Sequence, residues 1–281
     1  MNYRHAYHAG NFADVVKHAV LARNVAHLKE KPAAFRVIDT HAGAGLYDLA
    51  GPEASRTGEW REGIGKLAAA KLDPAVRDLL VPYLDAIETL NAGTLKVYPG
   101  SPVLLQQWLR PQDRLIACEK EPAAARVLAG RLRGDRRTKA VTIDGYTALN
   151  AYVPPKERRG LVLVDPPFEQ PDEFDILERG LSAAHRKWPI GIYALWYPVK
   201  DARETDRFSR RLPRLGIARM LQAELVLPAR EGLRGSGLIL VNPPWRLENE
   251  IAVLLPALLG VLGGAGTIRG RTLIRWLTPE R

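Results

Sequence analysis

The sequence predicts an α/β fold in which helices cover both faces of a parallel sheet, with one antiparallel strand at the sheet edge and a small inserted helical subdomain. Three observations lead to this class. Short apolar strand patterns alternate with helical patterns over most of the chain. About 70 residues separate the first strand pattern from the next clear one. The last two strand patterns are joined by a link too short for a crossover helix.

The amino-terminal part begins with a helical pattern over residues 12–29, a strand pattern over 34–38 and a glycine-rich turn over 41–45. A crossover normally needs only one helix of about a dozen residues. Residues 46–100 are too many for a loop and include the helical pattern 74–90. The predicted domains are therefore a main α/β domain formed by residues 1–45 and 101–281, and an inserted helical subdomain formed by residues 46–100.

The remaining elements alternate along the chain. Strand patterns cover residues 114–118, 140–143, 160–164, 190–196, 220–227 and 236–242, and helical patterns cover residues 122–132, 147–152, 173–188 and 202–215. Residues 228–235 are too few to hold a crossover helix, so the last two strands are predicted to be antiparallel.

The composition is that of a globular protein of 281 residues with a formal net charge of +10. A basic chain suits a polyanionic partner, although an ordinary basic protein has the same balance. Cys118 is the only cysteine, which excludes a disulfide framework and a cysteine metal cluster and fits the reducing cytoplasm. The amino terminus has no secretory signal, and the longest apolar stretch, residues 251–262, is too short for a membrane span. We expect a cytoplasmic protein without a metal or a membrane segment.

The most informative motif is Asp165-Pro166-Pro167-Phe168, which follows a buried strand pattern. Two prolines cannot continue the strand, so the backbone turns away at the carboxyl end, where α/β sheets bind ligands. The Asp165 carboxylate and the Pro166 carbonyl can accept hydrogen bonds from an exocyclic amine, and Phe168 can stack on a planar base. This tetrapeptide resembles the D-P-P-[YF] motif of S-adenosylmethionine-dependent amino-group methyltransferases.

A glycine-rich turn follows Asp39, the end of the first strand pattern. Gly43 and Gly45 allow the backbone to approach a ligand closely. The turn lacks the spacing G-x-G-x-x-G because Asp48 stands at the third glycine position, which disfavours a nicotinamide or flavin site.

Acidic residues close the next two strand patterns. Glu119 can accept both hydroxyls of a ribose, or can be a surface carboxylate paired with Lys120. Asp144-Gly145 can accept a hydrogen bond from an adenine amine, or can simply form a turn. Because these motifs all end strands at one sheet edge, their order is a stronger signal than any one of them.

A second tetrapeptide, Asn242-Pro243-Pro244-Trp245, matches the wider pattern [DNS]-P-P-[YFW]. The strand before it is the antiparallel one, so its carboxyl end should lie at the opposite sheet edge. We interpret this motif as structural: a strand exit and helix start, with Trp245 packed against the protein.

Several motifs together resemble those of the RlmJ-type 23S ribosomal RNA adenine-N6 methyltransferases. In order along the chain they are Tyr3–His18, Asp39–Gly45, Tyr98–Pro102, Tyr193–Pro198 and the Asn242 tetrapeptide. The resemblance implies a Rossmann-like class I methyltransferase sheet with an inserted helical subdomain. At Phe168 the family more often has Tyr; stacking survives this change, whereas a phenolic hydrogen bond does not.

The resemblance also implies the cofactor S-adenosylmethionine and the residues that contact it. The matching cofactor positions are His18, His41, Ser101, Glu119, Asp144, Gly145 and Asp165. Asp165 also matches the catalytic position, and Tyr3 matches a residue near the target base. The expected substrate-binding residues are therefore Tyr3, Pro166 and Phe168.

The residues alone leave simpler interpretations open. Ser101-Pro102 has the pattern of a helix N-cap with proline at the first helical position. His18 can be a partly buried histidine or a phosphate contact, and His41 can hold the glycine turn in shape. The segment Tyr3–His8 can be a disordered tail, but its aromatic and histidine content favours a lid over the pocket.

We therefore expect a monomer that methylates the N6 amine of an adenosine in naked or partly assembled 23S ribosomal RNA. The base has to leave its stack to enter the pocket. Basic side chains of the insertion and of residues 203–214 are candidate phosphate contacts, and a solvated face is the alternative for the latter.

Three other functions fit the sequence less well. A DNA adenine-N6 methyltransferase is disfavoured because no separate DNA-reading domain is recognisable. A non-catalytic RNA-binding assembly factor would not need the intact Asp165 motif. Glutamine methylation would favour Asn rather than Asp165 at the first motif position.

Overall fold

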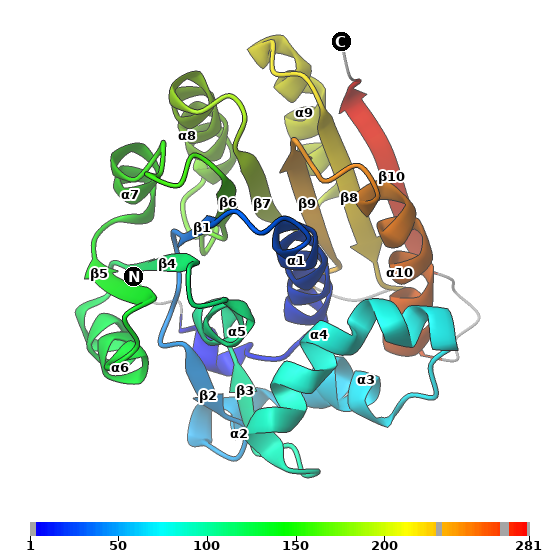
Figure 1. Ribbon diagram of the computed structural model, residues 1–281. Helices are drawn as coiled ribbons and strands as arrows, with labels where there is room; N and C mark the ends of the chain where they lie inside the picture. Colours follow the sequence, from blue (N-terminus) through cyan, green and yellow to red (C-terminus); the bar gives the residue numbers. More distant parts are fainter. Residues whose placement is uncertain (1–3, 229–231, 265–269, 280–281) are drawn as a thin grey trace.

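The computed structural model describes residues 4–228, 232–264 and 270–279. Its main feature is a sheet of eight strands in the order β10-β8-β9-β7-β6-β1-β4-β5 (Figure 1). The strands are β1 (Arg36–Asp39), β4 (Arg114–Glu119), β5 (Thr138–Thr142), β6 (Gly160–Val164), β7 (Ile192–Val199), β8 (Met220–Val226), β9 (Gly235–Val241) and β10 (Arg271–Thr278).

The strand directions confirm the α/β class and correct one detail of the prediction. β5, β4, β1, β6 and β7 are parallel neighbours. β8 and β9 are antiparallel, as predicted, but β9 lies inside the sheet between β7 and β8, and β10 forms the antiparallel edge. The physical reason is burial. Every residue of β9 is buried, whereas β10 exposes Arg271 and Arg275, and charged side chains are typical of an edge strand.

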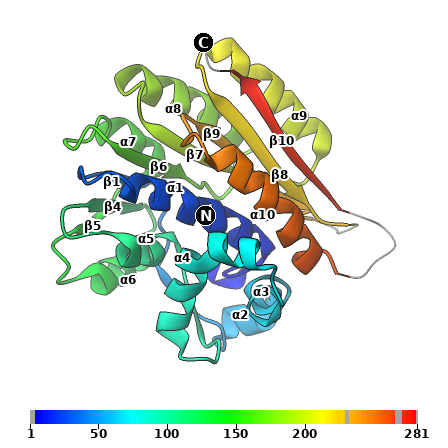
Figure 2. The ribbon, with the colours of Figure 1, turned by 45° about the vertical axis from the view of Figure 1, so that its right-hand side comes forward.

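Helices cover both faces of the sheet (Figures 1 and 2). Side chains alternate between the two faces along a strand: in β6, Leu161 and Leu163 join one hydrophobic cluster, and Val162 and Val164 join the other. The first face carries α1 (Phe12–Lys29), α5 (Ser101–Trp108), α6 (Pro122–Leu132) and α10 (Leu247–Leu262). The opposite face carries α7 (Gly145–Ala151), α8 (Glu173–Lys187), α9 (Ala202–Arg211) and the 3₁₀ turn Leu212–Leu215.

Helix α1 is buried on nearly all sides because it lies between the sheet, α10 and the insertion. The side chain of Asn11 caps it by accepting hydrogen bonds from the backbone N–H groups of Ala13 and Asp14, at 2.9 and 3.0 Å. This burial carries the polar residues Asp14, Lys17 and His18 into the interior.

The insertion between β1 and α5 consists of β2 (Leu46–Asp48), α2 (Pro52–Thr57), a π-helical turn (Arg61–Gly65), α3 (Lys66–Ala69), α4 (Pro74–Asn91) and β3 (Val97–Pro99). The predicted helix is α4, which packs beside α1 (Figures 1 and 2). β2 and β3 form a two-stranded antiparallel sheet that the sequence did not predict. Leu80 and Tyr83 of α4 join the core of the main domain, so the insertion shares that core.

No helix within the described ranges is both long and apolar enough to cross a lipid bilayer.

Candidate active site

A cleft of about 1010 Å³ lies at the carboxyl ends of the parallel strands, where β1, β4, β6 and β7 meet the amino-terminal segment and α1. Nine of the predicted site residues line it: His18, His41, Ser101, Glu119, Asp144, Gly145, Asp165, Pro166 and Phe168. The tenth, Tyr3, lies outside the described residues. Strand ends far apart in the sequence therefore form one concave site, as the strand order requires.

The glycine turn after β1 is held by Glu119. The backbone N–H of Gly43 donates to Glu119 Oε2 at 2.8 Å, and that of Glu121 donates to Oε1 at 2.7 Å. Gly43 has a φ of +62°, and a Cβ there would lie 2.3 Å from the hydroxyl oxygen of Tyr47. The alternative pairing of Glu119 with Lys120 is wrong, because Lys120 binds Asp144 instead, at 3.3 Å.

Asp144, Gly145 and His41 form the next part of the wall. Asp144 caps α7 by accepting a hydrogen bond from the backbone N–H of Thr147 at 3.0 Å. Gly145 has no room for a side chain, because a Cβ would lie 2.4 Å from the ring of His41. Burial lowers the pKa of His41 to about 4, so its ring is neutral at physiological pH.

Ser101 does not cap α5, and the N-cap interpretation is wrong. The N-cap residue is Gly100, and Ser101 is the first helical residue. Its hydroxyl instead donates to Asp39 Oδ2 at 2.6 Å. Burial raises the pKa of Asp39, which is fully enclosed, to about 7. The second oxygen of Asp39 has no hydrogen-bond partner in the described part of the chain.

Asp165 forms an ion pair that sequence reasoning missed. Lys17 Nζ binds Asp165 Oδ2 and, at 2.8 Å, Asp14 Oδ1. Burial acts to lower the pKa of Lys17, but the two carboxylates outweigh it and raise this pKa above its ordinary value. Asp165 Oδ1 has no hydrogen-bond partner among residues 4–228, 232–264 and 270–279. One oxygen of Asp165 is thus held in place and the other remains available to a ligand.

Aromatic side chains stand beside Asp165. Phe168 has a φ of +50°, a conformation that few residues other than glycine adopt. Its ring makes edge contacts with Phe174 and Trp196, at centroid distances of 4.9 and 5.9 Å. Trp196 lines the cleft, and its indole N–H donates to the Ser236 hydroxyl at 2.9 Å. The sequence pattern predicts a strand around Trp196 but does not indicate that this side chain lines the cleft.

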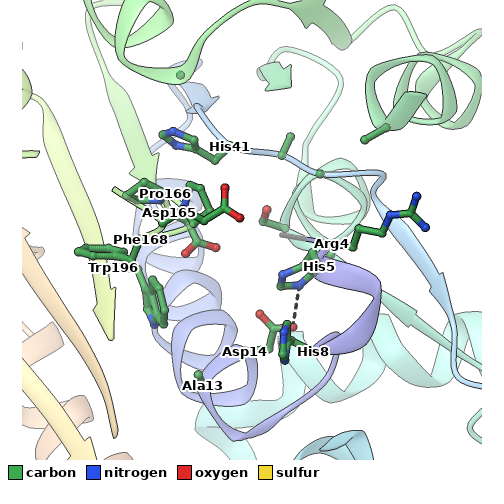
Figure 3. Close-up of a pocket in the computed structure, with 18 of the residues that line it drawn as sticks. Arg4, His5, His8, Ala13, Asp14, His41, Asp165, Pro166, Phe168 and Trp196 are labelled. Carbon is green, nitrogen blue, oxygen red and sulfur yellow. Dashed lines mark hydrogen bonds and ion pairs between the residues drawn. The ribbon is translucent and has the colours of Figure 1, made fainter. Parts of the chain in front are cut away.

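The described part of the amino-terminal segment lines the cleft, as expected for a lid. Figure 3 shows Arg4 and His5 on one side, and Asp165, Pro166, Phe168 and Trp196 on the other. His5 lies in the 3₁₀ turn His5–Tyr7, and its Nε2 is 3.0 Å from Asp14 Oδ2. A spacing of three residues puts Asp14 and Lys17 on one face of a helix, so the pair was visible in the sequence, although its partners were not.

The second tetrapeptide lies away from the cleft, as predicted, because β9 runs opposite to β7. The amide nitrogen of Asn242 donates to the carbonyls of Pro189 and Gly191, both at 2.8 Å. The predicted packing of Trp245 is wrong: its side chain is 77% exposed and contacts the guanidinium of Arg246. The turn before α10 is held by Asn242 and does not need the tryptophan.

Comparisons with known proteins agree with this site. A family described as ribosomal RNA large subunit methyltransferase D, RlmJ, matches residues 32–278. The chain is 40% identical to ribosomal RNA large subunit methyltransferase J of Escherichia coli strain K12 and 37% identical to that of Haemophilus influenzae, over the whole length of each. The solved structure of protein LPL1258 from Legionella pneumophila has a TM-score of 0.88 at 33% identity, covering 96% of this chain and 98% of that one.

Proposed function

This chain belongs to the RlmJ family of ribosomal RNA large subunit methyltransferases, and we propose that its cleft transfers a methyl group from S-adenosylmethionine to the N6 amine of an adenosine in 23S ribosomal RNA. One observation supports this most strongly. The Asp165 tetrapeptide and Glu119, which end different strands, line the same open cleft. The carboxylate of Asp165, which would contact the base, and that of Glu119, which would contact the ribose of the cofactor, therefore lie at the same edge of the sheet.

The donor groups of the cleft fit S-adenosylmethionine. A Cβ at Gly43 would collide with Tyr47 and one at Gly145 with His41, so these two positions of the cleft wall have no room for a side chain. Glu119 would accept the ribose hydroxyls, and Asp144 would accept from the adenine amine. His18 has a buried Nε2 without a partner among the described residues, and Ser101 begins helix α5, so its backbone N–H has no partner within the helix. Together these two groups suit a carboxylate.

Asp165 and Pro166 act on the target amine. When bound, the cofactor supplies a methyl group that is electrophilic because it is attached to a sulfonium. The adenine amine is a poor nucleophile, because its lone pair is delocalised into the ring. Asp165 Oδ1 and the Pro166 carbonyl accept the two amine hydrogens and favour a tetrahedral nitrogen, and the amine proton is lost during or after transfer. The rate enhancement comes chiefly from orientation and charge stabilisation in a site shielded from water.

Lys17 positions Asp165 for this role. Its ammonium is almost fully buried and contacts the carboxylates of Asp14 and Asp165 together. A carboxylate held at one oxygen presents the other in a defined direction, and this preorganisation is what an orientation mechanism needs. Phe168 and Trp196 hold the plane of the base.

The target base enters the cleft from a single-stranded, flexible or flipped nucleotide. The insertion has six Lys and Arg against eight Asp and Glu, a net charge of −2. In residues 203–214, Arg210 and Arg211 form ion pairs with carboxylates, whereas the exposed Arg203, Arg207 and Arg214 form none with any described residue. Exposed basic residues at and after α6 likewise form no ion pair with any described residue: Arg126, Arg131, Arg133, Arg136 and Lys139. This segment is a stronger candidate for phosphate contacts than the insertion.

The direct test is methyl transfer from labelled S-adenosylmethionine to naked 23S ribosomal RNA, assembled large subunit or DNA. We expect transfer to naked or partly assembled RNA by a monomeric enzyme of the cytoplasm, and its abolition by Asp165→Ala in a folded variant. Preferred transfer to DNA would favour a DNA adenine methyltransferase. Transfer to no substrate, together with RNA binding, would favour a non-catalytic assembly factor. Full activity of Asp165→Ala would overturn the assignment.

A further inference from the structure

Three aromatic side chains from different elements form a buried chain of hydrogen bonds beside the cleft. His18 Nδ1 on α1 lies 2.7 Å from the hydroxyl oxygen of Tyr98 on β3, and that oxygen lies 2.9 Å from the hydroxyl of Tyr83 on α4. His18 is 1% exposed, and both tyrosines are fully buried. Both tyrosines belong to the insertion, so this part of the molecule reaches the cleft through His18.

The direction of the hydrogen bonds among His18, Tyr98 and Tyr83 decides which ring nitrogen of His18 carries the imidazole proton. The ring is neutral, because burial, assisted by the charge of Lys17, lowers the pKa of His18 to about 3. A neutral imidazole has one N–H, and each tyrosine has one O–H. If Tyr83 donates to Tyr98 and Tyr98 donates to His18 Nδ1, both hydroxyl hydrogens have acceptors.

The opposite direction leaves two buried groups unsatisfied. If His18 Nδ1–H donated to Tyr98 and Tyr98 donated to Tyr83, neither the hydroxyl hydrogen of Tyr83 nor the unprotonated Nε2 of His18 would find a partner among the residues that the structure describes. The first direction leaves only the Nε2–H of His18 without one. Buried polar groups without partners are rare and costly. The first direction is therefore favoured, and it places the single imidazole proton on Nε2.

The Nε2–H of His18 is then a hydrogen-bond donor in a residue that lines the cleft. This atom is buried and has no partner among the residues that the structure describes. Ser101, the first residue of α5, follows Tyr98 by three positions and lines the same cleft. A helix amino terminus and an imidazole N–H together are complementary to an anion. The anionic group of the proposed cofactor is the carboxylate of its methionine part.

We propose that Tyr98 is a positioning residue that holds His18 in the Nε2–H tautomer, so that His18 donates to the carboxylate of S-adenosylmethionine. This inference rests on the proposed function and adds a role for the insertion, whose strand β3 supplies Tyr98. Tyr83 donates a hydrogen bond to the hydroxyl oxygen of Tyr98 but makes no hydrogen bond to His18 itself. Its hydroxyl is therefore not required for the tautomer of His18.

The test compares Tyr98→Phe with Tyr83→Phe, which removes a hydroxyl from the same core but leaves the bond between Tyr98 and His18. Calorimetry measures the binding of S-adenosylmethionine and of decarboxylated S-adenosylmethionine, which lacks the carboxylate. We expect Tyr98→Phe to weaken the first by about 10-fold, the value of a hydrogen bond to a charged group, and to leave the second unchanged. Tyr83→Phe should bind both as the unchanged protein does.

If Tyr98→Phe weakens the binding of both ligands equally, the role of Tyr98 is merely structural and the proposal is overturned. Nitrogen NMR of the His18 ring in the unchanged protein tests it without a variant: the Nε2–H tautomer is expected, and the Nδ1–H tautomer would overturn it. Failure of the unchanged protein to bind either ligand would instead contradict the proposed function, so the two failures are distinguishable.

Discussion

Replacement of Lys17 by methionine should be one of the most damaging single changes in the cleft. The side chain of Lys17 is 5% exposed and lies between Asp14 and Asp165, whose side chains are 3% and 13% exposed. Methionine keeps much of the apolar stem but removes the ammonium, which leaves two nearly buried carboxylates without their cation. Breaking a buried ion pair in this way typically costs about 3–5 kcal/mol of unfolding free energy.

Urea unfolding followed by tryptophan fluorescence measures this loss. The matched control is Lys66→Met. Lys66 forms a half-exposed ion pair with Glu62 and a long hydrogen bond of 3.4 Å to the carbonyl of Leu262, and the loss of this ion pair should cost no more than about 1 kcal/mol. Adding Asp14→Asn to Lys17→Met removes one stranded carboxylate and should restore part of the stability. Methyl transfer should stay low in both variants, since Asp165 still lacks its partner.

If Lys17→Met unfolds within about 1 kcal/mol of the unchanged protein, the ion pair does not have the energetic weight that its burial implies. If the variant is destabilised but transfers methyl groups at the normal rate, Lys17 stabilises the fold without positioning Asp165.

Three further changes test other parts of the site. Phe168→Ala should lower turnover at least about 10-fold, because it removes the stacking energy of one base on an aromatic ring. Phe168→Tyr should keep a turnover near that of the unchanged protein. Equal losses for the two variants in steady-state assays would argue against stacking. Gly145→Ala should weaken cofactor binding measured by calorimetry, because its Cβ would lie 2.4 Å from the ring of His41, and unchanged affinity would show that this wall adapts. Since burial lowers the pKa of His18 to about 3, the unfolded chain binds a proton below pH 6.5 that the folded protein does not. Stability should therefore fall as the pH drops, by about 2 kcal/mol from pH 6.5 to pH 5 through this residue. His18→Gln should make that part of a urea-unfolding profile less steep, although His41, whose pKa is lowered to about 4, keeps some of the slope; an unchanged slope would show that His18 is protonated in the fold.

Much of the candidate site was predictable because strand ends are local features. An apolar run that stops at Glu119, or at two prolines after Asp165, places a polar side chain at the rim of a parallel sheet whatever the rest of the chain does. Hence Glu119, Asp144, Gly145 and the Asp165 tetrapeptide line one cleft. The resemblance to the family, rather than a local pattern, implied that His18, His41 and Ser101 join them. The helix over residues 12–29 and the antiparallel last pair of strands followed in the same way from spacing and link length.

Contacts between distant segments were not predictable. Ser101 has the pattern of a helix cap, yet its hydroxyl binds Asp39, 62 positions earlier. Trp245 resembles a packing residue, yet it is exposed. The position of β9 inside the sheet depends on which strand pairs with β7 and which strand is left at the edge. The hydrophobicity of a single segment does not specify this order.

The amino-acid sequence by itself determined the class of fold, the order of the strands along the chain and the chemical groups at their ends, because periodicity and turn-forming residues act over a few positions. Only the tertiary structure decided that Lys17 meets Asp165 across 148 residues and that Tyr98 of the insertion meets His18. Both contacts join buried polar groups, and a buried polar group takes whichever partner the packing of the whole chain brings within reach.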